Sequence, residues 1–140
     1  SVSGSSLPIA TASCEVVVAL HVVEHLEDPD AFLREARCVL VPGGMIILAT
    51  PNPAALGARW MGPRWKGIRS DHIALRPPHA WRGGLESAGF RMHREGTTGL
   101  SGVPLFHKTP LALLHWIPML IFGFFPWKHG EAYICLATAA

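Results

Sequence analysis

Two short apolar runs constrain this 140-residue chain most strongly, because they predict the centre of its fold. The first is CEVVVAL at residues 14–20, and the second is MIILAT at residues 45–50. Both runs are short and continuous, and the first is rich in β-branched residues. This pattern is typical of strands that are buried on both faces, as they are in a parallel sheet.

The segment between the two runs predicts a helix from Asp28 to about Leu40. Asp28 suits the N-cap and Pro29 suits the first helical position. Pro42-Gly43-Gly44 then ends the helix and turns the chain. One stripe of this helix is apolar, at Phe32, Leu33, Ala36, Val39 and Leu40. Strand, helix, turn and strand form a βαβ unit, which predicts parallel strands joined by a right-handed crossover.

The next part of the chain predicts a long loop followed by a helix and two strands. Residues 54–77 contain five lysine or arginine residues and two tryptophans without clear periodicity, which predicts a functional loop. A helix is expected over 78–88, and strands are expected over 90–97 and 131–137.

An apolar segment at residues 103–127 separates the last two expected strands. Its part from 109 to 127 has no formal charge and is nearly long enough to span a membrane, but prolines and a glycine interrupt it. We therefore expect a buried helical pair that covers an apolar pocket as a lid. A peripheral contact with a membrane is the intermediate alternative.

Composition excludes several classes of protein. The formal charge is 12 − 10 = +2 and no basic run is present, which argues against a nucleic-acid partner. The three cysteines show no CxxC pairing, so a disulfide framework and a cysteine zinc site are not expected. Cysteine usage of this kind favours a reducing compartment, and we expect a cytoplasmic protein, membrane-associated if segment 103–127 contacts a lipid surface.

A series of motifs follows in a fixed order along the chain. The series consists of Leu7-Pro8, Glu15, the HVVEH segment at 21–25, Asp28-Pro29, Pro42-Gly43-Gly44, the TPNP segment at 50–53 and Asp71-His72-Ile73. In this order and spacing the chain resembles a class I S-adenosylmethionine-dependent methyltransferase. It is most similar to the small-molecule branch that includes the ubiquinone-pathway O-methyltransferases. The resemblance covers essentially the whole chain.

The resemblance implies an α/β fold, a Rossmann-like sheet with strand order 3-2-1-4-5-7-6. The strands of this chain would be the fourth to the seventh, the first three would be absent, and residues 1–140 would form a single partial domain. The family's glycine-rich cofactor loop has no counterpart, because no G-x-G-x-G occurs in the sequence. Strand 14–20 would then be an open apolar edge, which favours association with the missing half or with a second copy.

The function implied by the resemblance is methyl transfer from S-adenosylmethionine to a small, apolar acceptor, incomplete in this chain. Leu7, Ala19, Leu20 and His21 would contact the cofactor. A histidine at position 21 or 25 would act as general base, since imidazole titrates near neutral pH. Asn52 and His72 are further candidates for contact with the acceptor, and for each a structural role is the alternative.

The HVVEH segment is also a candidate metal site. In the ubiquinone-pathway members an E-x-x-E-H at this place holds a divalent metal, whereas this chain has His21, Glu24 and His25. Replacement of a carboxylate by imidazole shifts the preference away from magnesium, toward a softer ion or none. The alternative is that Glu24 and His25 only fix the turn.

Two other functions remain open from the sequence. H-x-x-E-H is also the inverted zinc-protease signature, but that chemistry needs a helix, and a predicted strand and Pro29 leave little room for one. The second alternative is a non-catalytic methyltransferase fragment that acts by association.

Overall fold

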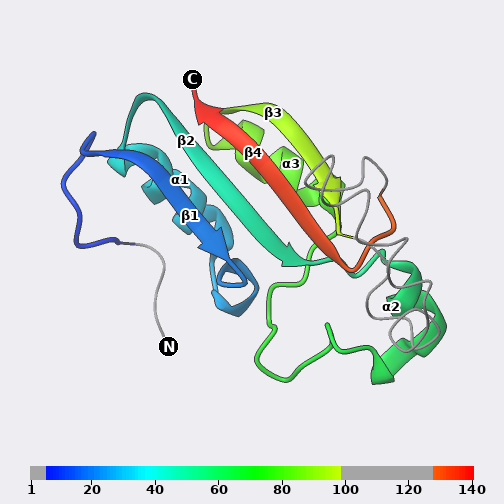
Figure 1. Ribbon diagram of the computed structural model, residues 1–140. Helices are drawn as coiled ribbons and strands as arrows, with labels where there is room; N and C mark the ends of the chain where they lie inside the picture. The colour runs from blue at the N-terminus through cyan, green and yellow to red at the C-terminus, as the bar shows by residue number, and fades with distance from the viewer. Residues whose placement is uncertain (1–5, 99–127) are drawn as a thin grey trace.

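The computed structural model describes residues 6–98 and 128–140, so the expected apolar lid at 103–127 lies outside the described residues. In these residues four strands form one mixed sheet in the order β1-β2-β4-β3 (Figure 1). The elements are β1 (Cys14–Leu20), η1 (Val23–His25), α1 (Pro29–Val39), β2 (Leu40–Pro51), α2 (Leu56–Met61), η2 (Gly62–Arg64), α3 (Pro78–Ser87), β3 (Phe90–Thr97) and β4 (Ala132–Ala139).

The predicted βαβ unit is confirmed. Strand β1 pairs with β2 in parallel, with Val18 opposite Ile47, and α1 connects the two strands. Strand β4 is antiparallel to both β2 and β3. The observed order β1-β2-β4-β3 agrees with the order 4-5-7-6 that the resemblance predicts for these strands, and the absence of three further strands stays a prediction.

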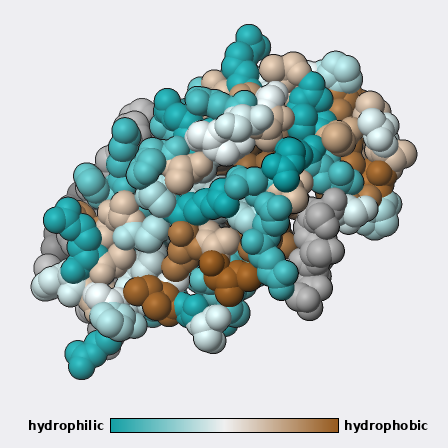
Figure 2. All heavy atoms as spheres, turned by 180° about the vertical axis from the view of Figure 1, so that it is seen from behind, coloured by the Kyte–Doolittle hydropathy of each residue, from teal (hydrophilic) through white to brown (hydrophobic). Residues whose placement is uncertain are grey.

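Helices α1 and α3 lie on the same face of the sheet (Figure 1). The Asp28 carboxylate caps α1 by accepting a hydrogen bond from the Ala31 N–H at 2.8 Å, as the sequence predicts. The outer surface of this helical side is largely hydrophilic (Figure 2). The core between helices and sheet includes Leu33, Ala36, Ile46, Leu48, Trp81, Leu85 and Cys135.

The boundaries differ from the sequence predictions in two places. Strand β2 begins at Leu40, directly after α1, and its pairing with β1 is irregular between Cys14 and Val16. A side chain at position 44 would lie 2.9 Å from the Val41 carbonyl oxygen, so this close approach needs glycine. The expected loop at 54–77 also contains α2 and η2, which periodicity did not reveal because both are short.

The expectation that residues 14–20 are buried on both faces is wrong for this chain. Val16, Val18 and Leu20 are 48%, 56% and 55% exposed, whereas Ala19 between them is buried. The exposed side chains share the face opposite the helices, since alternate residues of a strand point to opposite faces. Strand β1 is also at the edge of the sheet, so within the described residues it has a free edge and an apolar face.

No helix within residues 6–98 and 128–140 has both the length and the apolar character that a membrane crossing requires.

We predict that the exposed valines of β1 mediate association of the chain with itself, because an unpaired apolar edge invites strand pairing. Replacement Val18→Lys should therefore lower the weight-average mass in sedimentation velocity over a concentration series. Glu86→Lys, on the exposed side of α3, is the matched control and should leave the mass unchanged. A wild-type chain that stays monomeric at all concentrations would contradict the prediction.

Candidate functional site

The candidate site lies where β1 and β2 end side by side, at the carboxyl ends of parallel strands. Ligands bind at this edge in open α/β sheets. The chain leaves β1 at His21, whose backbone N–H donates to the Ala49 carbonyl oxygen of β2 at 2.8 Å. It then forms η1, in which Val23 and Glu24 are buried.

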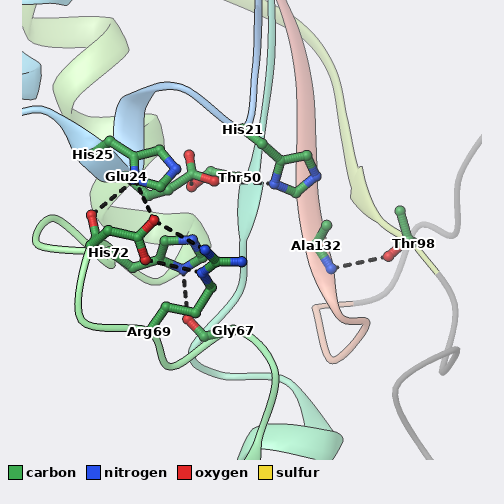
Figure 3. A network of polar contacts seen from close by, with 10 residues as sticks. His21, Glu24, His25, Thr50, Gly67, Arg69, His72, Thr98 and Ala132 are labelled. Atoms are coloured by element: carbon green, nitrogen blue, oxygen red, sulfur yellow. Dashed lines mark hydrogen bonds and ion pairs between the residues drawn. The ribbon is translucent and has the colours of Figure 1, made fainter. Parts of the chain in front are cut away.

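Glu24 is the central residue of the site and is fully buried. Its Oε1 atom lies 3.1 Å from His21 Nδ1, and its Oε2 atom accepts a hydrogen bond from Thr50 Oγ1 at 3.3 Å (Figure 3). Its backbone carbonyl oxygen accepts from the Ala74 N–H at 3.0 Å. Glu24 therefore joins η1, the end of β2 and the segment before α3.

His21 is held by Glu24 but remains accessible, since its side chain is 58% exposed. An ionised carboxylate only accepts hydrogen bonds, so the His21 Nδ1 atom carries the hydrogen in this pair. The Nε2 atom then has a free lone pair, as a general base requires. The backbone of His21 has φ +53°, a conformation that is uncommon outside glycine and is found at functional sites.

His25 and His72 lie against each other, although they are far apart in the sequence. Their rings meet edge to face with centroids 4.8 Å apart. His25 Nδ1 is 2.9 Å from the Asp71 carbonyl oxygen, and His72 Nδ1 is 2.8 Å from the Gly67 carbonyl oxygen. A carbonyl oxygen only accepts, so each Nδ1–H is the donor, and in the neutral form of each ring the Nε2 atom has a free lone pair.

The expected metal-ligand set changes accordingly. Glu24, His25 and His72 each offer one ligand atom, and these three atoms lie within 4.8 Å of one another. His21, which the sequence placed in this set, instead hydrogen-bonds to Glu24. Sequence analysis missed Thr50 as a partner of Glu24, although its place at the end of a predicted parallel strand was a usable signal.

The segment from residue 65 to residue 77 is anchored at both ends. The Trp65 indole N–H donates to the Glu131 carboxylate. At the other end Arg76 forms a bidentate pair with Asp30 of α1 at 2.7 and 2.9 Å, and its guanidinium lies 5.2 Å from the Trp81 ring centre. The hydrogen bond from Arg76 lowers the pKa of Asp30 below its ordinary value.

The other predicted site residues have different surroundings. Asn52 is buried, and its amide donates to the Lys128 and Gly130 carbonyl oxygens at 2.9 and 2.8 Å. It also accepts from the Ala54 N–H, which is the turn-capping role. Among the expected cofactor contacts, the side chains of Leu7 and Ala19 pack in or against the core, whereas Leu20 is exposed beside His21.

The geometry disfavours the zinc-protease alternative. That motif needs a helix that places both histidines on one face. Here residues 23–25 form a single 3-10 turn between β1 and α1, and His21 lies outside it.

Comparison with known proteins identifies relatives of the chain. Residues 7–95 match a family model for a methyltransferase domain. A ubiquinone biosynthesis O-methyltransferase from Parvibaculum lavamentivorans is 30% identical over 121 residues, which cover 79% of this chain and 46% of the relative. A probable S-adenosylmethionine-dependent methyltransferase from Mycolicibacterium smegmatis is 46% identical over 48 residues, covering 34% of this chain and 19% of the relative.

A solved structure shows the same fold. The S-adenosylmethionine-dependent methyltransferase from Thermotoga maritima superposes with a TM-score of 0.71 at 14% identity, over 98% of this chain and 61% of that protein. The chain therefore spans about half the length of the Parvibaculum relative and somewhat more of this structural neighbour.

We predict that the Asp30–Arg76 pair stabilises the chain in a pH-dependent way. Because Arg76 lowers the pKa of folded Asp30 below 3.8, the contribution is present above pH 3.8 and is lost as the pH falls through the folded value. Asp30→Asn should cost up to about 1 kcal/mol near pH 7, since the pair is partly exposed. Urea unfolding of both proteins should show this difference shrinking in acid, whereas Glu86→Gln should show little difference at any pH.

Proposed function

Because the chain belongs to the methyltransferase domain family, we propose that it takes part in transfer of a methyl group from S-adenosylmethionine to a small, apolar acceptor. The observation that carries this proposal is the accessible His21 held by the buried Glu24 at the end of β1. A base in this position is suited to take the proton of an acceptor hydroxyl.

The residues of this chain offer only part of a cofactor site. Leu20 and His21 lie at the carboxyl end of β1, where the family resemblance expects the cofactor. The sequence has no G-x-G-x-G, so the backbone donors that meet the cofactor's carboxylate end in the family have no counterpart here. We infer that this chain contacts the cofactor through only part of the family's contacts. When bound, S-adenosylmethionine would supply the methyl group.

The proposed role of His21 follows from its orientation. Its Nε2 lone pair would accept the proton of the acceptor hydroxyl, while Nδ1–H keeps its bond to Glu24. The buried carboxylate would stabilise the imidazolium that forms, and the Thr50 hydroxyl would hold the carboxylate in place. The chain itself would contribute two things: it would position His21 beside the acceptor, and it would remove the proton of the acceptor hydroxyl.

An apolar acceptor is favoured by the surroundings of His21. Leu20 and Val22, on either side of it in the sequence, are both exposed. Removal of such apolar surface from water by an acceptor ring or alkyl chain is favourable.

The competing proposal is a non-catalytic fragment that acts by association through β1. It is supported by the missing glycine-rich loop and by the free edge of the sheet. The two proposals differ in one measurable property, which is binding of S-adenosylmethionine.

We predict that His21→Ala lowers the rate of methyl transfer by about 10²–10⁴-fold, the usual contribution of a positioned general base. Formation of S-adenosylhomocysteine with a catechol-type acceptor is the readout. Cofactor affinity, measured by calorimetry, should stay within about twofold, because a base acts on the acceptor proton. His79→Ala, at an exposed position of α3, is the control and should keep the wild-type rate. Absence of cofactor binding by the wild-type chain would instead favour the non-catalytic fragment.

A further inference from the structure

The family resemblance implies a divalent metal at the segment of Glu24 and His25; we propose that in this chain His72, in place of His21, completes the ligand set and that the set takes a zinc-class cation. The ligand atoms of Glu24, His25 and His72 lie within 4.8 Å of one another, in a place where the sequence alone pointed to His21 as a ligand. The inference goes beyond the proposed methyl transfer and does not rest on it, since metal binding needs neither cofactor nor acceptor.

The imidazoles of His25 and His72 would both bind the metal through Nε2. The Nδ1–H groups of His25 and His72 are taken up by the carbonyl oxygens of Asp71 and Gly67 (Figure 3). Metal-binding histidines commonly donate their second ring N–H in this way, which fixes the ring and directs the other nitrogen at the ion. Here the two free Nε2 atoms belong to rings that contact each other.

Glu24 supplies a carboxylate whose ion-pair partner among the described residues is His21. It is fully buried, and within the described part of the chain no lysine or arginine forms an ion pair with it. A buried carboxylate without a cation is costly. The bonds from His21 and Thr50 occupy only some of its lone pairs, so the carboxylate can still bind an ion.

The segment that carries His72 is held in position by contacts outside the ligand set. Arg69 donates to the Asp71 carboxylate at 3.0 and 3.3 Å, and Ala74 donates its N–H to the Glu24 carbonyl oxygen. Asp30 fixes the end of the same segment through Arg76. The third ligand is therefore brought to the η1 turn by the fold itself, which lowers the cost of ordering on binding.

The donor set selects the class of ion. Two imidazole nitrogens and one carboxylate oxygen are the ligand set of His₂Glu zinc sites, which leave a fourth position open. Magnesium prefers oxygen ligands in near-ideal octahedral geometry, so this set disfavours it. His21 is excluded because its Nδ1–H bonds to Glu24 and its ring lies outside the cluster.

Isothermal titration of the metal-free chain with Zn²⁺ and with Mg²⁺ tests the site. We expect one Zn²⁺ per chain and no saturable Mg²⁺ binding. His72→Ala removes a direct ligand of the metal. Loss of an outer-shell partner typically weakens metal binding by about 10–100-fold, so His72→Ala should weaken Zn²⁺ binding by more than that. His79→Ala should keep the wild-type affinity, whereas His21→Ala removes only a hydrogen-bond partner of Glu24 and should weaken binding by no more than about 10–100-fold. Weakening by His21→Ala with none by His72→Ala, or equal affinity for Mg²⁺, would overturn the proposal.

Cobalt substitution and one further variant separate loss of a ligand from loss of the fold. Co²⁺ bound by the wild-type chain should give the visible absorption of a four-coordinate site. His72→Cys should retain Co²⁺ and add a near-ultraviolet thiolate-to-cobalt band, because the new side chain would be a direct ligand. A His72→Cys chain that binds Co²⁺ without this band would show that position 72 does not contact the metal. These results stand whether or not the chain transfers methyl groups.

Discussion

The buried carboxylate of Glu24 is the constraint on which the site depends. An uncompensated carboxylate in an apolar interior is costly, so its partners must stay in place. His21 and Thr50 bond to it from two segments, and the Ala74 N–H bonds to the Glu24 backbone carbonyl oxygen from a third. The left-handed backbone of His21, the end of β2 and the course of the segment before α3 are consequently coupled through one residue.

The parts of the fold that the sequence predicted are those with local signals. Asp28 and Pro29 start α1 as expected, and the two apolar runs form parallel strands. The approach of His72 to His25 had no local signal, because 46 residues separate His25 from the Asp71 carbonyl that orients it. The same holds for Trp65 and Glu131, which meet only in the folded chain. Sequence analysis thus named His72 as a candidate but did not predict its contact with His25, which tertiary contacts bring about.

Strand β1 shows a second limit of sequence reasoning. Three successive valines are compatible with burial on both faces, and local pattern alone does not say what covers each face. In this chain α1 and α3 cover one face, while Val16 and Val18 are exposed on the other. The chain spans 46% of the length of the Parvibaculum relative.

The anchoring of residues 65–77 decides what this segment can do. A closing lid needs few contacts and a low cost of opening. This segment instead bonds to Glu131, the residue before β4, through Trp65, to α1 through Arg76–Asp30 and to η1 through Ala74–Glu24. Opening it would break a bidentate ion pair and the hydrogen bond from the Ala74 N–H to the Glu24 backbone carbonyl oxygen at once. Its role is therefore to hold His72 against His25 as a fixed wall of the site.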